Sequence, residues 1–386
     1  MSVTAAAGFL AAGVPAGLKS TGNPDVALVR NVGPLQNAAA VFTSNRCKAN
    51  PVLWSAEAIK DGTIGAIVLN SGGANCYTGA QGFHTTHATA ERVAELLGIS
   101  AGDVLVCSTG LIGEQLDLAK VTSGVTDAAS ALAGTPEAAL AAAEAIRTTD
   151  TRPKQAQRTS PAGWTIGGMA KGAGMLAPGL ATMLVVITTD AVLSSAELDA
   201  ALRESTRVTF DRLDSDGCMS TNDTVALLAS GASGVAAEAA EFTAVLTELC
   251  ADLARQLQAD AEGASHDIAI TVAGAADEEE AVEVARAVSR SNLFKAAIFG
   301  NDPNWGRVLA AVGTTAAHFD PYGIDVSFNG VRICRAGEPD QPRELVDLAP
   351  RQVDILIDLH VGDASATVLT NDLTHDYVHE NSAYAS

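Results

Sequence analysis

KGAGMLAPGLATMLVVITT, residues Lys171 to Thr189, joins a loop to a strand. Its first half contains several glycines and Pro178, which break regular secondary structure. Its second half continues as the apolar, β-branched run Leu184 to Ile187, which is typical of a strand buried on both faces. Thr182 lies at the junction. A hydroxyl at the start of a buried strand is a plausible chemical site, although threonine is also common as an ordinary first residue of a strand.

Strand and helix patterns alternate on both sides of this stretch. Ser194 and Glu197 have the spacing of a helix capping box, and apolar residues from Phe242 to Leu257 form one stripe of a long helix. Asn329 and Gly330 between two apolar runs predict a hairpin with a type I′ turn. Strands are predicted at 26–29, 38–42, 64–69, 104–106, 268–272, 324–328, 331–334, 353–359 and 366–369. The alternation predicts a mixed α/β fold.

Length and charge limit the functional classes. A chain of 386 residues predicts two or three domains, or one intertwined fold. Hydrophobic residues make up 47% of the chain, which is enough for a large core. The net charge of −21 argues against sequence-independent binding of nucleic acid, which needs a basic surface. It does not exclude an anionic small substrate, because a few local cations can dominate one pocket.

Neither a metal site nor a membrane segment is predicted. The cysteines form no CxxC motif, and His84 and His87 lack a nearby carboxylate or thiol partner. The acidic segment 214–224 begins like a calcium loop but has no glutamate at the twelfth position. The N-terminus lacks the features of a signal peptide, and no apolar run approaches the roughly 20 residues of a membrane helix. We therefore expect a soluble, cytoplasmic protein with reduced thiols and no cofactor.

Several polar segments follow predicted strands or helices. Residues 70–79, 107–110 and 148–154 can each present backbone N–H groups or small polar side chains to a ligand, or can be ordinary turns. Glu262 is less expected, because it lies at the end of a predicted helix, where the helix dipole favours cations. This placement is an indication of function.

A set of motifs along the chain resembles one enzyme family. The motifs are CSTGLIG (107–113), TTDTRPK (148–154), GGMAKGAGM (167–175), STNDT (220–224), QADAEG (258–263), DPNWGRVLAAVG (302–313) and the C-terminal ENSAYAS. They resemble, in order and over nearly the whole chain, the ornithine acetyltransferases, also called glutamate N-acetyltransferases, of arginine biosynthesis. Two segments depart from the family pattern: Ser265 and His266 stand where Thr-Lys is common, and Cys76 and Tyr77 stand where Ala-Cys is usual.

The resemblance implies self-cleavage between Ala181 and Thr182. The hydroxyl of Thr182 would attack the carbonyl of Ala181, and water would release the resulting ester, which leaves an α chain of residues 1–181 and a β chain of residues 182–386. The new α-amino group of Thr182 has an unperturbed pKa of roughly 7.7–8.0, so it can act as the base for its own hydroxyl.

The resemblance also implies a ping-pong acetyl transfer from N2-acetylornithine to L-glutamate through acetyl-Thr182. Thr109 and Gly110 would stabilise the tetrahedral oxyanion. Lys171 would pair with the α-carboxylate of the substrates, and Glu262 would hold the ornithine amino group. The family's substrate-binding positions correspond to Thr148, Lys171, Thr182, Glu262, Asn381 and Ser386.

For the fold, the resemblance implies layered mixed sheets covered by helices, with an α-β-β-α-like core and a smaller C-terminal α/β subdomain at about 240–370. The tail, 371–386, would return to the active site and be ordered. The two chains would assemble as (αβ)2 or larger, with small-molecule substrates and no nucleic-acid or membrane partner. Three alternatives stay open: acetyl-CoA as a second donor, a self-cleaving aminopeptidase or amidase, and a non-catalytic binding protein.

Overall fold

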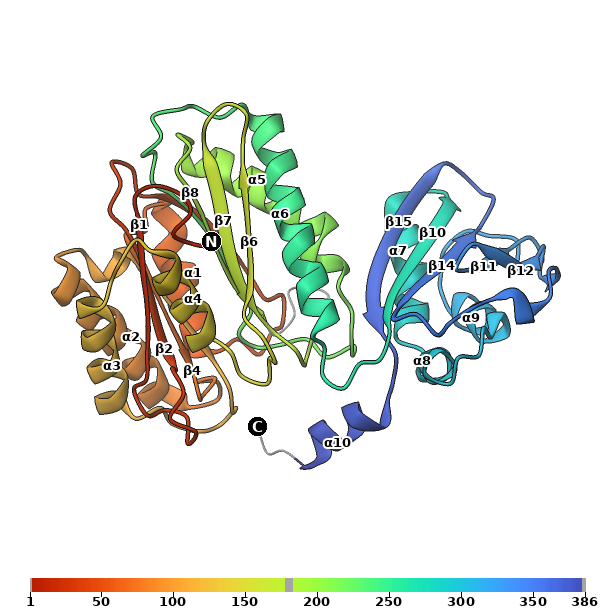
Figure 1. Ribbon diagram of the computed structural model, residues 1–386, viewed down its shortest axis with the longest axis horizontal. Helices are drawn as coiled ribbons and strands as arrows, with labels where there is room; N and C mark the ends of the chain where they lie inside the picture. The colour runs from red at the N-terminus through yellow and green to blue at the C-terminus, as the bar shows by residue number, and fades with distance from the viewer. Residues whose placement is uncertain (1, 178–182, 384–386) are drawn as a thin grey trace.

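The computed structural model describes residues 2–177 and 183–383 (Figure 1). Ala181, Thr182 and Ser386, which the sequence singles out, lie outside the described residues. The larger body contains two sheets. One has the strand order β1-β2-β4-β5, and the other has the order β3-β9-β8-β7-β6. Their bounds are β1 (Phe9–Val14), β2 (Val26–Asn31), β3 (Asn37–Phe42), β4 (Ala66–Ser71), β5 (Val104–Thr109), β6 (Lys154–Thr159), β7 (Thr165–Lys171), β8 (Leu184–Thr189) and β9 (Thr224–Ala229).

Helices cover the outer faces of both sheets. On the first sheet pack α1 (Asn50–Ala58), α2 (Gly79–Leu97) and α3 (Leu118–Ser130). Helix α4 (Pro136–Ala145) instead packs against β1 and β2 on the side of the apolar cluster between the sheets. On the second sheet pack α5 (Ser195–Val208) and α6 (Ala239–Ala259). One apolar cluster lies between the two sheets and one lies under the helices of each outer face. The expected α-β-β-α layering is therefore confirmed.

Strand β8, which contains the apolar run Leu184 to Ile187, is central in its sheet. All residues of β8 are buried, as its apolar run predicts. β8 pairs with β7 in antiparallel orientation, with Lys171 opposite Leu184, and with β9 in parallel orientation, with Leu184 opposite Thr224. The carboxyl end of β7 and the beginning of β8 therefore lie at the same edge of the sheet.

A smaller domain follows α6. Its sheet has the order β13-β12-β11-β14-β10-β15 and encloses an apolar core of its own with its helices. The elements are β10 (Asp267–Ala275), α7 (Glu278–Ser289), α8 (Asn292–Phe299), α9 (Trp305–Val312), β11 (Asp325–Phe328), β12 (Val331–Arg335), β13 (Glu338–Pro339), β14 (Gln352–Asp358) and β15 (Ala364–Asn371). The predicted Asn329-Gly330 turn is confirmed, with positive φ at both residues. Helix α6, part of the predicted 240–370 subdomain, packs on the larger body instead.

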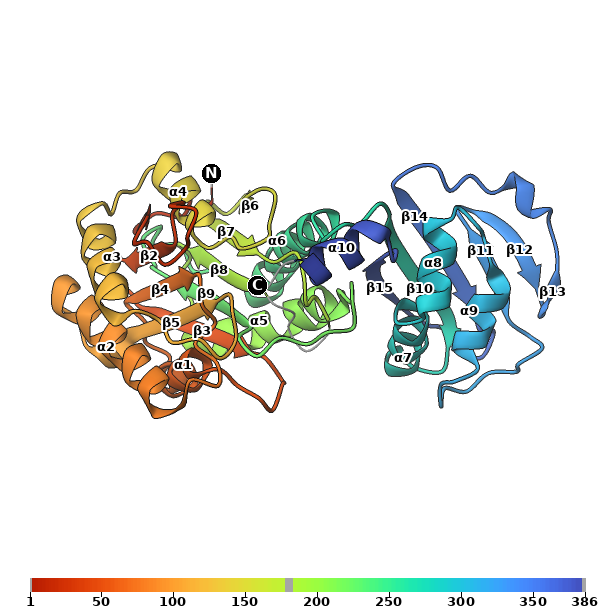
Figure 2. The same ribbon diagram turned by 90° about the horizontal axis from the view of Figure 1, so that it is seen from below.

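The chain ends by returning to the larger body. Helix α10 (His375–Ala383) runs from β15 back towards the first domain in both views (Figures 1 and 2). Short 3-10 helices complete the fold at Ile59–Asp61, Ala101–Asp103, Phe210–Arg212 and Arg343–Leu345. Within the described ranges, no helix is both long enough and apolar enough to span a membrane.

Candidate active site

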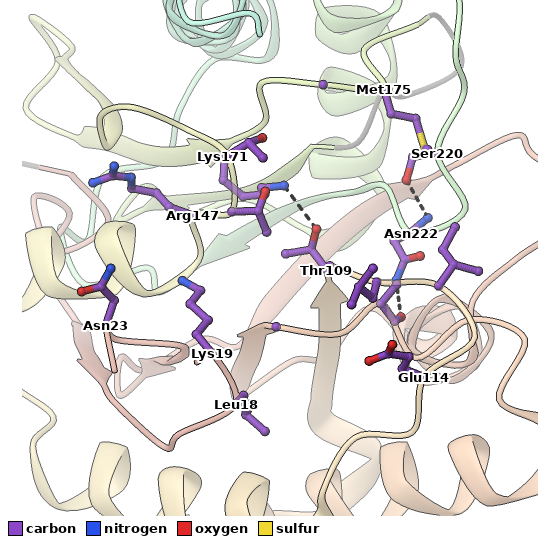
Figure 3. A pocket seen from close by; sticks show the side chains of 18 of the residues that line it. Leu18, Lys19, Asn23, Thr109, Glu114, Arg147, Lys171, Met175, Ser220 and Asn222 are labelled. Atoms are coloured by element: carbon purple, nitrogen blue, oxygen red, sulfur yellow. Dashed lines mark hydrogen bonds between the residues drawn. The ribbon is translucent and has the colours of Figure 1, made fainter. Parts of the chain in front are cut away.

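A cavity of about 930 Å³ opens at the edge where β5 and β7 end (Figure 3). Its walls come from the segment after β1, the turns after β4 and β5, the loop after α4, the end of β7, the segment before β9 and α10. The predicted site residues that line it are Thr109, Gly110, Thr148, Lys171, Glu262 and Asn381. Tertiary structure thus brings together every predicted site residue that lies within the described ranges.

The end of β5 has the geometry of an anion-binding turn. The N–H groups of Gly72 and Gly73 both donate to the carbonyl oxygen of Thr109, at 3.0 Å. Gly110 has φ +129°, and a Cβ there would lie 2.5 Å from the nitrogen of Gly73, so the position requires glycine. Its own N–H donates to no other described residue. The turn therefore presents a free backbone donor beside the Thr109 side chain.

The segment before β9 holds this turn in place. The side-chain amide of Asn222 donates to the carbonyl oxygens of Ala74, at 2.6 Å, and Ser108, at 2.8 Å. Asn222 is buried and lies just before β9. The second sheet therefore anchors the turn that ends the first sheet. Asn222 lies in the STNDT motif, and its hydrogen bonds to this turn were not predicted from the sequence.

Lys171 lies at the carboxyl end of β7 and is only 1% exposed. Its ammonium nitrogen donates to the hydroxyl oxygen of Thr109 at 3.2 Å (Figure 3). Burial lowers the pKa of Lys171, and Asp150 opposes that shift. The side chain of Lys171 therefore lies beside that of Thr109, the residue that the sequence resemblance implies for oxyanion stabilisation.

Asp150 is a buried carboxylate behind the cavity wall, and it was not predicted as a site residue. It accepts from the N–H of Gly172 at 2.7 Å, the N–H of Thr148 at 3.1 Å and the ammonium of Lys154 at 2.6 Å. Burial alone would raise the pKa of Asp150, but Lys171 and Lys154 hold it down at about 2. Asp150 therefore fixes the backbone of two predicted substrate-binding segments. Its place in TTDTRPK was the available signal.

Glu262 lies in the turn after α6, and both of its oxygens have partners. The hydroxyl of Thr149 donates to Oε1 at 2.6 Å, and the amide of Asn381 donates to Oε2 at 3.0 Å. Its backbone N–H donates to Ala173 at 2.9 Å. A Cβ at Gly174 would lie 2.3 Å from Oε2, so this carboxylate needs glycine opposite it. These contacts hold the carboxylate at the cavity surface.

Helix α10 carries Asn381, and its backbone passes close to Gly263, the residue after Glu262. Gly263 has φ +61°, and a Cβ there would lie 2.2 Å from the nitrogen of Tyr377. The hydroxyl of Thr374 donates to the carbonyl oxygen of Gly263 at 2.6 Å. The described part of the tail is therefore helical, and it contacts the turn that contains Glu262 and Gly263.

Met183, the described residue directly before β8, is held by the segment before β9. The N–H of Met183 donates to Oδ1 of Asp223 at 3.1 Å, and the N–H of Thr224 donates to the carbonyl of Met183 at 3.2 Å. Asp223 is fully buried, and burial raises its pKa well above the usual value of a carboxyl group. Residue 183, which follows the predicted cleavage bond by one residue, is thus fixed near Lys171 and the cavity edge.

The cavity also contains cations, although the chain is strongly acidic. Lys19 and Arg147 lie on the same side as Lys171 (Figure 3). Burial is the main cause that lowers the pKa of Lys19, and Asp25 opposes it. Neither residue was singled out from the sequence. In residues 2–177 and 183–383, no group of three or more His, Cys, Asp or Glu side chains is arranged to hold a metal ion.

The layered sheets and the cavity assembled across them define a small-molecule enzyme of the α-β-β-α class. The model of the ArgJ family matches residues 10–386, and this chain belongs to that family. The resemblance found in the sequence is thereby confirmed.

Curated relatives with full-length alignments agree with this family assignment. The arginine biosynthesis bifunctional protein ArgJ of Streptomyces coelicolor is 60% identical, and that of Thermobifida fusca is 61% identical; each alignment covers 100% of both chains. Among solved structures, ornithine acetyltransferase from Mycobacterium tuberculosis, complexed with ornithine, is 52% identical. That match covers 46% of this chain and 94% of that chain, with a TM-score of 0.46.

Proposed function

We propose that this chain is an acyltransferase of arginine biosynthesis that moves an acetyl group from N2-acetylornithine to L-glutamate. Membership of the ArgJ family over residues 10–386 supports the reaction class. The observation that carries the site assignment is the convergence of Thr109, Lys171, Glu262 and Asn381, which are far apart in sequence, on one cavity.

The proposed first half-reaction uses Thr182 as the nucleophile. Its hydroxyl oxygen attacks the acetyl carbonyl of N2-acetylornithine, and its proton passes to the α-amino group of the same residue. The oxyanion that forms accepts hydrogen bonds from the Thr109 hydroxyl and the Gly110 N–H. The C–N bond then breaks, the ornithine nitrogen takes the proton, and acetyl-Thr182 remains.

The second half-reaction reverses these steps with glutamate. The amino group of glutamate attacks the acetyl-Thr182 ester, the same donors stabilise the second oxyanion, and Thr182 recovers its proton as N-acetylglutamate leaves. Lys171 and Thr148 are proposed to bind the α-carboxylate that both substrates share. Glu262, Asn381 and Ser386 are proposed to bind the remainder of the substrate.

Self-cleavage between Ala181 and Thr182 supplies the base for this chemistry, and denaturing electrophoresis tests it. Active enzyme is expected to give chains of residues 1–181 and 182–386. Thr182→Ala is expected to stay in one piece and to transfer no acetyl group, because it lacks both the hydroxyl and the cleavage reaction. A single intact band from active wild-type enzyme would contradict the mechanism.

The acetyl acceptor and donor are tested by product analysis. Purified enzyme with N2-acetylornithine and glutamate is expected to release ornithine and N-acetylglutamate in equal amounts. Release of ornithine and acetate without N-acetylglutamate would identify an amidase. We also propose acetyl-CoA as a second donor, since the relatives are named bifunctional. Formation of N-acetylglutamate from acetyl-CoA and glutamate tests that second activity separately.

We further propose a cytoplasmic location and an assembly of at least two copies of each cleaved chain. The support is the resemblance to the acetyltransferase family. A native mass near twice that of the uncleaved 39.2 kDa chain, or a higher multiple, is expected. A native mass of a single αβ pair would contradict this assembly.

A further inference from the structure

The contact between Lys171 and Thr109 has a defined direction. An ammonium group has N–H donors and no acceptor, so the Thr109 oxygen must accept the hydrogen bond of 3.2 Å. A threonine hydroxyl carries one proton, and that of Thr109 is donated to no other described residue. With its oxygen turned to Lys171, Thr109 keeps its proton available for an acceptor in the cavity.

This direction depends on the charge of Lys171. A neutral amine has a lone pair and can accept the proton of the Thr109 hydroxyl, which would remove that donor from the cavity. Lys171 is buried, so desolvation favours the neutral amine. The charge on Lys171 therefore has to be maintained by its surroundings.

Charged groups face Lys171 from several elements. The acidic groups that favour its ammonium form are Asp150 after α4, Asp223 before β9 and Glu262 after α6; the cations that oppose it are Lys154 on β6 and Lys19 after β1. Asp150 has the largest favourable influence of these acids. It also accepts from the N–H of Gly172, the residue directly after Lys171, at 2.7 Å. Asp150 thus acts on both the charge and the position of Lys171.

We propose that Asp150 is a positioning residue for oxyanion stabilisation: it keeps Lys171 charged and in place, and Lys171 in turn fixes the Thr109 hydroxyl as a donor to the acetyl oxygen. The inference rests on the proposed acetyl transfer. It gives Lys171 a role in the chemical step in addition to its proposed binding of a carboxylate.

The pH dependence follows from the lowered pKa of Lys171. Below that pKa the ammonium is present and Thr109 donates to the oxyanion. As pH rises through it, the proton is lost and the donor is withdrawn, so kcat falls on the alkaline side. Removing the charge of Asp150 lowers the pKa of Lys171 further, so the alkaline limb of kcat moves to lower pH.

The test compares Asp150→Asn with Asp260→Asn. Both carboxylates bind the ammonium of Lys154 at 2.6 Å, but Asp150, unlike Asp260, is among the main groups that act on Lys171. Asp150→Asn is expected to lower kcat about 10²-fold, the effect of losing one oxyanion donor, and to shift the alkaline limb of kcat to lower pH. Asp260→Asn should leave that limb in place. An unshifted limb in Asp150→Asn would overturn the proposal.

A double-mutant cycle separates positioning from a general structural effect. In a Thr109→Val background the donor is already lost, so adding Asp150→Asn should lower kcat by less than about 3-fold. If the two substitutions lower kcat by factors that multiply, Asp150 does not act through Thr109.

Should Asp150→Asn fail to fold, Lys171→Gln replaces it. In this variant the fall of kcat at alkaline pH must disappear, and its persistence would overturn the proposal. If the wild type itself transfers no acetyl group, the proposed function fails instead.

Discussion

At the scale of single residues, the site depends on charged side chains that are buried. Lys171, Lys154 and Asp150 are almost fully buried. Lys154 and Asp150 form an ion pair at 2.6 Å, and the ammonium of Lys171 donates to the hydroxyl oxygen of Thr109. Glu262 differs, because it faces the cavity and its known partners, Thr149 and Asn381, are neutral. A carboxylate that is held in place but not neutralised is suited to bind a cationic group of a ligand.

We therefore expect Glu262→Gln to weaken the binding of N2-acetylornithine. The variant keeps the shape and one acceptor of the side chain but loses the charge. A hydrogen bond to a charged group contributes about 1.5–3 kcal/mol, so KM for N2-acetylornithine should rise roughly 10- to 150-fold. Steady-state kinetics measures this. Glu114→Gln, which removes an equal charge from the same cavity, serves as the control, and an equal rise in both variants would contradict a specific role for Glu262.

At the scale of elements, the docking of α10 depends on one glycine. The helix backbone passes Gly263 so closely that any side chain there would collide with Tyr377. The same helix carries Asn381, which donates to Glu262 at 3.0 Å. A substitution at Gly263 that displaces α10 would therefore also displace Asn381 in the cavity.

Gly263→Ala is expected to displace α10 and to reduce kcat/KM by more than 10-fold, while the rest of the fold stays intact. Gly330→Ala is the matched control: Gly330 also has positive φ, at +82°, but a Cβ there would meet nothing within 4 Å. Both variants carry the backbone strain of a side chain at positive φ, about 1–2 kcal/mol. Limited proteolysis of the tail and acetyl-transfer kinetics are the measurements. Equal activity of the two variants would show that α10 docking does not support the site.

At the scale of the whole molecule, the predicted cleavage divides one sheet between two chains. Strands β3, β7 and β6 belong to residues 1–181, and β9 and β8 belong to residues 182–386. The pairs β7–β8 and β3–β9 therefore join the two chains by continuous ladders. Both faces of this sheet are covered by apolar clusters to which the two chains contribute.

The cleaved chains are accordingly expected to remain one particle. Their separation would expose unpaired strand edges and two apolar faces, which is strongly unfavourable in water. The cleaved enzyme should elute as a single peak in native size-exclusion chromatography and should yield two polypeptides only after denaturation. Separate native elution of the two polypeptides would contradict this arrangement of strands.

Much of the fold follows from local pattern. The buried run Leu184 to Ile187 forms β8, the Ser194 capping box begins α5, and Asn329-Gly330 forms the predicted turn. These predictions succeed because each depends on residues that are close in the sequence: alternation, capping and turn conformation are local properties. The family motifs likewise indicated the reaction class from the sequence alone.

The arrangement of the site was decided by tertiary structure. Thr109, Lys171 and Glu262 meet only because β5, β7 and the end of α6 reach one edge of the layered core. The sequence left open whether the segment with Asp150 is a pocket wall or a solvated loop, and it did not single out Asp223. Burial and the nearest opposite charge depend on segments far along the chain. The sequence by itself determined the elements and the chemical groups. Long-range packing determined which groups share the cavity and which charges are desolvated. It also placed Lys171 so that the Thr109 oxygen accepts its hydrogen bond.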